Sequence, residues 1–585
     1  MNWFRYENVL GNPDSPERGS ARQQVYTSMR HTGQNLDLLW KAPMVWISAP
    51  TWTMVSCNML SEKLSEMMVA ELKKRNLIGL ISPIVWVSDG VLNGHPNMWN
   101  SLHSRNMIAN QVAYGTDAYK PDAHIGLFAC DKTGPGEVMW YASLVNNNHT
   151  EQRWDVPAVM MYAGSTIPGF CHLAEDYKAT IADALAKWWI SDQPDIVDGF
   201  KLPALEQGDL ITRDQWERVL KHTVEEIGAC QWMYTANTMS VALEVLGMTA
   251  PESCTQITTD WKIDGMIQKT VDCIEICMRE WITPNKIITE ASIRNALAVI
   301  NALGWSTNAL LHFKALANRL DFQLGNDFFT EVRNNTPMVW DLKPFGTWNM
   351  VDYIKNGDHK TLLRRMIDGG YIDGTLPTVT WESLWDNVES IQDKKPTGNT
   401  TLHQFDNPIR DKGNLVPLAG NLANHSVMKV TADTEKYFKW RAVCFDSEQA
   451  ACEWIMNGAV RDGDVVVIRF VWPRAAGMPE MLTPTSLIKA KDLKVALISD
   501  GRFSGGSYGA VVWHVSPEAA LGWPISKLQT GDEIEIDSEN GTINVNGVDL
   551  NSREAIKFKD KRDKFHPVRQ YGAMMGSADE WADHI

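Results

Sequence analysis

The segment HIGLFACDKTGPGEV, residues 124–138, begins as an apolar run of strand length and ends in a Gly-Pro-Gly turn that opens a helical pattern. Cys130, Asp131 and Lys132 stand at the junction between the two. Open α/β sheets bind ligands at the carboxyl ends of their strands. The segment therefore predicts a thiol, a carboxylate and an amine at a ligand-binding edge, although a buried cysteine followed by a surface Asp-Lys pair would give the same pattern.

The same alternation of short apolar runs and longer helix-period segments fills the first two-thirds of the chain. Residues 124–130 and 156–164 are expected to be buried strands, and residues 60–76 and 238–248 to be helices. Such alternation favours an α/β domain with a mainly parallel sheet. The chain turns polar at 391–404, around Pro396 and Gly398, where a linker is expected. We therefore predict an N-terminal α/β domain at 1–390 and a second domain at 391–585.

The second domain is expected to be rich in β-strands. Residues 462–470 and 494–501 have the composition of buried strands. Residues 532–547 alternate with a period of two around Asn540-Gly541, which is a strong hairpin signal. Together these patterns predict a β-rich, barrel-like C-terminal domain.

Composition excludes several classes of partner. The net charge of −16, with acidic and basic residues interspersed, argues against nucleic acid or an anionic membrane. No run approaches the roughly 20 apolar residues of a membrane span, and the first residues lack the basic and apolar regions of a secretory signal. The nine cysteines are odd in number, widely spaced and without a CxxC pair, so no disulfide framework is expected. We expect a soluble, cytoplasmic protein, with Cys273 and Cys277 packed in a buried helix.

A second glycine-rich loop follows a predicted strand in KVALISDGRFSGGSYG, residues 494–509. Backbone N–H groups in such a loop can form an anion-binding nest, which would suit Ser504 to act as a base or nucleophile. A tight turn without chemistry is the alternative. A hydrolase triad is poorly supported, because no GxSxG elbow is present.

Three further segments carry polar or thiol side chains among loop residues. Residues 227–239 hold Cys230, with Asn237 and Thr238 as possible helix caps. Residues 86–98 hold Asp89 and His95, and residues 472–481 hold Glu480. Each segment taken singly is typical of a loop.

In this order, however, the segments resemble the dihydroxy-acid and sugar-acid dehydratase family, whose hallmarks are CDKxxPG and (S/T)DGRxSGG. Both motifs are present, at 130–136 and 499–506. The likeness extends through TIPG (166–169), STNALLH (306–312), DLKPFG (341–346), DNPI (406–409), GNLA (420–423), HVSPEAA (514–520) and GSADEWA (576–582). Residues 88–95, TIPG and MYTANTM are similar to the branched-chain amino-acid branch of the family, whereas AAGMPE is similar to its sugar-acid branch.

The resemblance implies a reaction and a set of cofactors. The reaction is the removal of water from a small 2,3-dihydroxy carboxylate to give a 2-oxo acid, with Ser504 as the base. Cys57, Cys130 and Cys230 correspond to ligands of an iron–sulfur cluster with one open iron. Three cysteines serve either cluster type, and [2Fe–2S] is expected ahead of [4Fe–4S]. Ligands of Mg²⁺ are Asp89, Asp131, Glu480 and Lys132, the last after carbamylation, because an ammonium group has no acceptor atom. A homodimer or a dimer of dimers is also implied.

The chain departs from the family pattern at several glycine positions that hold tryptophan here. These are Trp232, Trp305, Trp472, Trp513 and Trp523, among 25 tryptophans in all. Glycine serves where backbone approaches closely or takes positive φ, and an indole meets neither need. Two interpretations are open: a pocket reshaped for another substrate, or a crowded site in a non-catalytic homologue. The presence of every expected ligand and of Ser504 favours activity.

Overall fold

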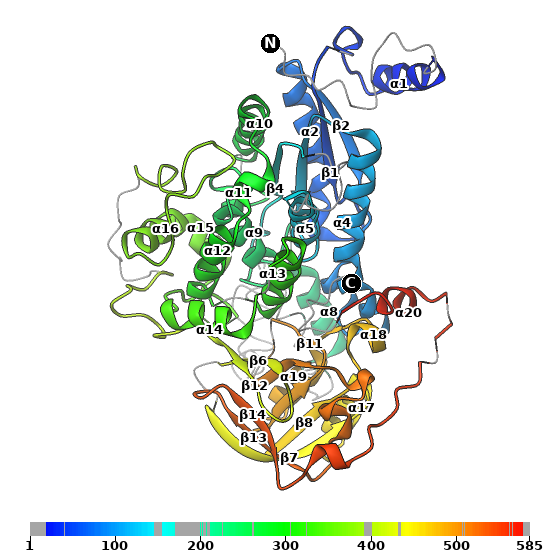
Figure 1. Cartoon of the computed structure of the whole chain (residues 1–585), viewed down its shortest axis with the longest axis vertical. Helices are drawn as coiled ribbons and strands as arrows, with labels where there is room; N and C mark the ends of the chain where they lie inside the picture. The colour runs from blue at the N-terminus through cyan, green and yellow to red at the C-terminus, as the bar shows by residue number, and fades with distance from the viewer. Residues whose placement is uncertain are drawn as a thin grey trace.

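The computed structural model has an α/β part at one end and a β-barrel at the other (Figure 1). It describes residues 19–145, 155–169 and 211–576, except positions 40, 225, 260, 261, 305, 323, 345, 391–400, 431–434, 506, 508, 561 and 564. Between 170 and 210 only positions 199, 202 and 206 are described. The predicted domain border at 390/391 adjoins residues outside this set and remains a prediction.

The α/β part is built on a four-stranded parallel sheet of order β2-β1-β3-β4. The strands are β1 (Met44–Ala49), β2 (Ile78–Pro83), β3 (Ala123–Phe128) and β4 (Ala158–Tyr162). Strands β1, β3 and β4 are buried along their whole length, as expected where helices cover both faces of a parallel sheet. The predicted parallel sheet is confirmed.

Helices cover both faces of this sheet. Those that pack on it are α2 (Leu60–Lys74), α4 (Asn100–Tyr119), α5 (Thr133–Val145) and α10 (Ile263–Glu280). Gly115 of α4 lies against the Trp46 indole of β1, whereas Gly79 of β2 lies against Leu72 of α2. Cys273 and Cys277 of α10 are buried, as predicted.

Further helices extend the α/β part on the side opposite α4 (Figure 1). They are α9 (Thr235–Val245), α12 (Glu290–Ala302), α13 (Thr307–Arg319), α14 (Asn326–Asn335), α15 (Met350–Asn356) and α16 (Asp358–Asp368). Helix α9 begins three residues before the predicted start at 238, so neither Asn237 nor Thr238 caps it. Instead, Asn237 is buried and donates to the carbonyls of Cys230 and Trp232 at 2.6 and 2.8 Å.

The C-terminal part is an eight-stranded mixed sheet that curls into a nearly closed barrel of order β14-β13-β7-β8-β10-β12-β6-β5. Its strands are β5 (Leu415–Leu418), β6 (His425–Lys429), β7 (Tyr437–Phe445), β8 (Asp464–Ile468), β10 (Ala496–Ser499), β12 (Ala510–Ser516), β13 (Glu533–Asp537) and β14 (Thr542–Asn546). Backbone bonds join the edges: Ala419 N–H donates to Gly541 O at 3.0 Å, and Ile543 N–H donates to Ala419 O at 3.1 Å. The barrel-like domain and the β13/β14 hairpin are confirmed.

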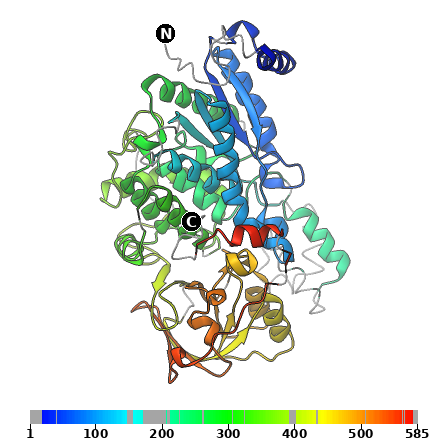
Figure 2. The same ribbon diagram turned by 45° about the vertical axis from the view of Figure 1, so that its right-hand side comes forward.

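The two parts meet along a buried apolar contact. Helix α20 (Pro567–Gly572) packs on α18 (Pro473–Ala476) and α4, and Figure 2 shows it lying between the α/β part and the barrel. Side chains from both parts pack together there: Leu102, Leu311, Trp472, Met478 and Met575. Among the described residues no helix is long and apolar enough to cross a membrane.

Helix α5 carries a buried acidic side chain, Glu137, on the side that faces strand β1. Glu137 is fully buried and accepts a hydrogen bond from Ser48 of β1. Its other carboxylate oxygen has no partner. Burial raises the pKa of Glu137 to about 8, although the Ser48 hydrogen bond opposes this. The folded protein therefore carries a neutral Glu137 through a pH range in which the unfolded chain carries an ionised one.

Replacing Glu137 with glutamine is expected to stabilise the fold at neutral and mildly alkaline pH. The raised folded pKa means that wild-type stability falls as pH rises from 4.5 to about 8, by at most about 1.4 kcal/mol per pH unit for this group. Thermal midpoints of Glu137→Gln and wild type should coincide near pH 4.5 and separate progressively toward pH 8. A difference that does not grow with pH would contradict the buried neutral acid.

Candidate active site

The carboxyl edge of the parallel sheet carries three of the residues predicted to act at the site. Asp89 follows β2 as the first residue of α3 (Asp89–Leu92), and Asp131 and Lys132 join β3 to α5. The turn after β3 is held by Thr133, whose Oγ1 accepts from the N–H groups of Ala129 and Cys130, each at 3.1 Å. Parallel strands end at the same edge, so this local geometry places the side chains of both loops together.

The C-terminal part supplies two more predicted residues, Glu480 and Ser504, through a short parallel ladder. Strand β9 (Glu480–Met481) pairs with β11 (Arg502–Phe503), so that Glu480 lies opposite Arg502. Ser504 continues this ladder, because its N–H donates to the Met481 carbonyl at 2.8 Å. Glu480 and Ser504, which are 24 positions apart in the sequence, therefore lie on neighbouring strands.

Three buried carboxylates converge between the two parts of the molecule. One oxygen each of Asp89, Asp131 and Glu480 lies within 4.8 Å of the others. The Lys132 amine, which is fully buried, lies 2.7 Å from Asp89 Oδ2 and also contacts the Asp131 carboxylate. The structure thus brings together all four residues that the sequence predicted as Mg²⁺ ligands.

Arg502 and Asn308 belong to the same cluster but were not predicted from the sequence. The Arg502 guanidinium lies 3.3 Å from Asp89 Oδ2 and 3.2 Å from Glu480 Oε2. Asn308 of α13 donates to Glu480 Oε2 at 2.8 Å and accepts from Arg502 at 3.2 Å. Ser101 donates to Asp89. Arg502 lies inside the SDGRFSGG motif, and its place there was the feature of the sequence that could have identified it as a site residue.

The electrostatics of the cluster favour an added cation. Burial and the nearby Asp89 charge raise the pKa of Asp131 to about 8, and the same two causes raise that of Glu480 to about 7. Burial also opposes ionisation of Asp89, but the charges of Lys132 and Arg502 lower its pKa well below the usual range. The two positive charges of Lys132 and Arg502 are therefore not sufficient to keep all three carboxylates of the cluster ionised. Hard oxygen donors with this shortage of positive charge fit Mg²⁺.

The predicted cluster cysteines lie on three loops that the backbone ties together. Cys57 lies in the 3₁₀ turn Ser56–Asn58, and the Gly228 N–H donates to the Ser56 carbonyl at 3.0 Å, next to the Cys230 segment. Gly228 has φ +141°, and a Cβ there would lie 2.7 Å from the Thr166 nitrogen, so only glycine fits this crossing.

The thiols share one region at this crossing. A hydrogen bond with Cys57, together with burial, raises the pKa of Cys130 well above its ordinary value. The Tyr162 hydroxyl donates to Asn237 Oδ1 at 2.7 Å, and Asn237 donates to the Cys230 carbonyl at 2.6 Å, so the Cys230 loop is tied to the end of β4. Two thiols in contact, with a third on a loop tied to the same region by its backbone, suit an iron–sulfur cluster, whose metal would stabilise the thiolates.

The glycine-rich loop differs in part from its prediction. The N–H of Ser504 is engaged with Met481, and the N–H of Ser507 donates to the Ser504 carbonyl at 3.0 Å. Neither group can therefore line an anion-binding nest. The loop is also held by Lys429, whose buried amine donates to the Gly505 carbonyl. His95, predicted with Asp89, accepts the N–H of Asn97 and so orders its own turn.

The tryptophans do not share one environment. Trp472 and Trp513 are fully buried in core packing, whereas Trp523 is 44% exposed. Trp305 lies outside the described residues. Trp232 follows Cys230 and packs on Tyr234 at 5.5 Å between ring centroids, and Tyr234 in turn abuts Gly505. Trp513 also lies near the serine loop, because its ring is 6.1 Å from that of Phe503 and 6.0 Å from the Lys429 amine that holds Gly505. Among the described residues, tryptophan therefore borders the predicted site at Trp232 and at Trp513.

Comparison with known proteins agrees with this arrangement. The family model described as dihydroxy-acid/6-phosphogluconate dehydratase N-terminal matches residues 42–387, and the corresponding C-terminal model matches residues 400–582. The chain therefore belongs to the dihydroxy-acid/6-phosphogluconate dehydratase family, a family of hydro-lyases.

Individual relatives carry a more specific name. A protein of Francisella tularensis subsp. novicida (strain U112) named dihydroxy-acid dehydratase is 34% identical over 553 residues, which is 94% of this chain and 92% of the relative. Proteins of the same name from Prochlorococcus marinus (strain AS9601) and Methylococcus capsulatus (strain ATCC 33009 / NCIMB 11132 / Bath) are 32% and 34% identical. They cover 95% and 92% of this chain, and 94% and 90% of their own lengths.

Proposed function

We propose that this protein dehydrates 2,3-dihydroxy-3-methylbutanoate to 3-methyl-2-oxobutanoate, a step of valine and isoleucine biosynthesis. The observation that carries the proposal is the β9/β11 ladder, which pairs Glu480 with Arg502 and continues to Ser504 through its N–H bond to the Met481 carbonyl. A candidate base thus lies next to a candidate metal site, as abstraction of a proton beside a carboxylate requires. The curated relatives named dihydroxy-acid dehydratase support the choice of substrate.

In this proposal, oxygen ligands bind one cofactor and thiolate ligands bind the other. Asp89, Asp131, Glu480 and carbamylated Lys132 would hold Mg²⁺. The thiolates of Cys57, Cys130 and Cys230 would hold an iron–sulfur cluster, for which we retain [2Fe–2S]. When bound, these groups supply Lewis acidity toward the substrate carboxylate and its two hydroxyl groups.

The protein's own residues then move the proton and exclude water. Ser504, once deprotonated, takes the proton from C2, and the C3 hydroxyl group leaves with its bonding electron pair. The proton held by Ser504 then converts that group into water, which restores the ionised serine. The enol that remains tautomerises to the 2-oxo acid. Ser504 is only 8% exposed, and the buried Arg502 guanidinium nearby contributes fixed positive charge as the serine ionises. Asn308 and Ser101 keep Glu480 and Asp89 oriented.

Carbamylation of Lys132 is expected to be linked to Mg²⁺ binding. The three carboxylates with Lys132 and Arg502 sum to −1 when all are ionised, and the sum stays −1 when a carbamate replaces the ammonium and Mg²⁺ enters. Mg²⁺ affinity measured by calorimetry should therefore increase with bicarbonate in wild type and lose this dependence in Lys132→Arg. A free Lys132 amine in the crystal structure of active enzyme would contradict the proposal.

Anaerobic turnover tests the proposed function and its substrate. Protein with reconstituted iron and sulfide is incubated with Mg²⁺ and either 2,3-dihydroxy-3-methylbutanoate or a pentonate, and the 2-oxo acid is measured. Turnover of the branched acid alone supports the proposal. Turnover of the pentonate alone moves the enzyme to the sugar-acid branch, which the AAGMPE segment resembles. A fully loaded protein with no turnover of either would be a non-catalytic homologue.

The cellular location and the oligomeric state of the enzyme are part of the proposal. We place it in the cytoplasm, as a homodimer or a dimer of dimers, in keeping with the resemblance to the family. The native mass from light scattering distinguishes these assemblies from a monomer.

A further inference from the structure

A second group of metal-ligating side chains lies in the α/β part, apart from the proposed active site. Glu244 of α9, Cys254 of the 3₁₀ turn Ser253–Thr255 and His359 of α16 offer ligand atoms that all lie within 4.8 Å of one another. All three side chains are buried, at 6%, 0% and 2% exposure. No residue of this group belongs to the carboxylate cluster or to the predicted cluster cysteines.

Two of the three ligand groups, the His359 ring and the Glu244 carboxylate, are already oriented by further contacts. The Nδ1 atom of His359 lies 2.6 Å from the Tyr353 hydroxyl, which leaves Nε2 directed toward Glu244 and Cys254. The two oxygens of Glu244 accept the backbone N–H groups of Glu252 and Cys254, at 2.8 and 2.9 Å. Outer contacts of this kind fix the tautomer and the orientation of metal ligands.

The spacing of the ligand atoms is close to that around a tetrahedral ion. His359 Nε2 lies 2.9 Å from Glu244 Oε1 and 3.4 Å from Cys254 Sγ. Bond lengths to zinc of about 2.0–2.1 Å for nitrogen or oxygen and about 2.3 Å for sulfur imply edges of about 3.3 and 3.6 Å. The groups therefore need to separate by only a few tenths of an ångström to admit the ion.

Charge and ligand chemistry select the kind of ion. A thiolate, a carboxylate and a neutral imidazole carry two negative charges, which a divalent ion neutralises completely. Neutrality matters here because the site is buried. Sulfur with imidazole and one carboxylate suits zinc, whereas Mg²⁺ prefers oxygen alone.

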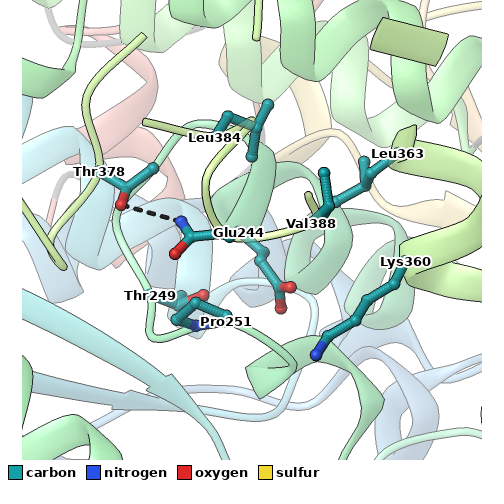
Figure 3. A pocket seen from close by; sticks show the side chains of 9 residues that line it. Glu244, Thr249, Pro251, Lys360, Leu363, Thr378, Leu384 and Val388 are labelled. Atoms are coloured by element: carbon teal, nitrogen blue, oxygen red, sulfur yellow. Dashed lines mark hydrogen bonds between the residues drawn. The ribbon is translucent and has the colours of Figure 1, made fainter. Parts of the chain in front are cut away.

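A small pocket borders the group on the side of Glu244. Glu244 lines a pocket together with Thr249, Lys360 and Leu363, and Figure 3 shows the Glu244 carboxylate and the Lys360 amine on its wall. Lys360 itself pairs with Glu252 at 3.1 Å. Water from this pocket would complete a four-coordinate site with three protein ligands.

We propose that Glu244, Cys254 and His359 bind one Zn²⁺ ion, with water from the adjacent pocket as the fourth ligand. The ion would join α9, α16 and the 249–256 loop. That loop is connected to the predicted site, because Ser253 Oγ accepts the N–H of Tyr162, whose hydroxyl donates to the Asn237 side chain that holds the Cys230 carbonyl.

Metal analysis of the anaerobically purified holoenzyme tests this proposal. Protein from zinc-supplemented cells, prepared without chelators, should contain about one zinc per chain. Zinc should fall at least tenfold in Cys254→Ser and in His359→Gln, and stay unchanged in the control Cys273→Ser, a buried cysteine of α10. Iron content, measured in the same samples, shows whether the variants fold.

X-ray absorption at the zinc edge of the wild-type holoenzyme supplies a readout that needs no variant. One sulfur at about 2.3 Å with nitrogen or oxygen neighbours at about 2.0–2.1 Å is expected. Three sulfur neighbours would place the zinc on Cys57, Cys130 and Cys230 and overturn the proposal. A wild-type protein without zinc, or an unchanged zinc content in Cys254→Ser, would overturn it as well.

Discussion

Cys130→Ala protein is expected to be colourless after anaerobic purification and to have no measurable dehydratase turnover. Cys130 lies between β3 and α5, and its thiol forms a hydrogen bond with Cys57 of the same predicted thiol set. A cluster on three thiolates retains too few protein ligands when one is removed. Iron and acid-labile sulfide should fall at least tenfold, and the visible absorbance should disappear with them.

A second buried cysteine provides the matched control for this experiment. Cys452 lies in α17 (Glu448–Met456) of the barrel part and is 8% exposed, as is Cys130. Cys452→Ala should keep the iron content, the colour and the turnover of wild type. Full iron content in Cys130→Ala would show that the cluster is held elsewhere.

Ser504→Ala is expected to lower kcat by roughly 10³–10⁴-fold, toward the upper end of what a general base contributes. KM should change little, because the proposed substrate-binding groups stay in place. Iron and Mg²⁺ contents should equal those of wild type, since Ser504 is not among the proposed ligands. The measurement is anaerobic initial-rate kinetics with metal analysis on the same preparation.

Ser507 offers a control within the same loop. It is buried like Ser504, and its hydroxyl has no hydrogen-bond partner among the residues that the structure describes. Ser507→Ala should keep kcat within a few-fold of wild type. A Ser504→Ala enzyme with comparable kcat would mean that another group takes the C2 proton.

The main architecture could be predicted because its signals are local. Buried parallel strands need continuous apolar runs, and those at 124–130 and 156–164 became β3 and β4 with ends shifted by one or two residues. The period-two alternation around Asn540-Gly541 became the β13/β14 hairpin, in which Gly541 takes φ +68°. Both patterns depend on residues that are neighbours in sequence.

The geometry of the site could be predicted from the sequence only in part, because it depends on residues that are far apart in the chain. The β9/β11 ladder is two residues long on each strand, too short for any periodicity. One consequence is that Arg502, which lies opposite Glu480, also contacts Asp89, a residue 413 positions away in the sequence. For Asn237 a local signal was misleading. Asparagine is favoured at helix caps, but this residue lies inside α9 and its side chain holds the Cys230 loop.

The central claim, that the converging carboxylates and Ser504 form a working dehydratase site, is tested most directly by anaerobic turnover of 2,3-dihydroxy-3-methylbutanoate. The reconstituted, Mg²⁺-loaded protein is predicted to convert it to 3-methyl-2-oxobutanoate, with the rate lost on chelation of Mg²⁺. A protein with full iron, sulfide and Mg²⁺ contents that forms no 2-oxo acid from any dihydroxy acid would contradict it.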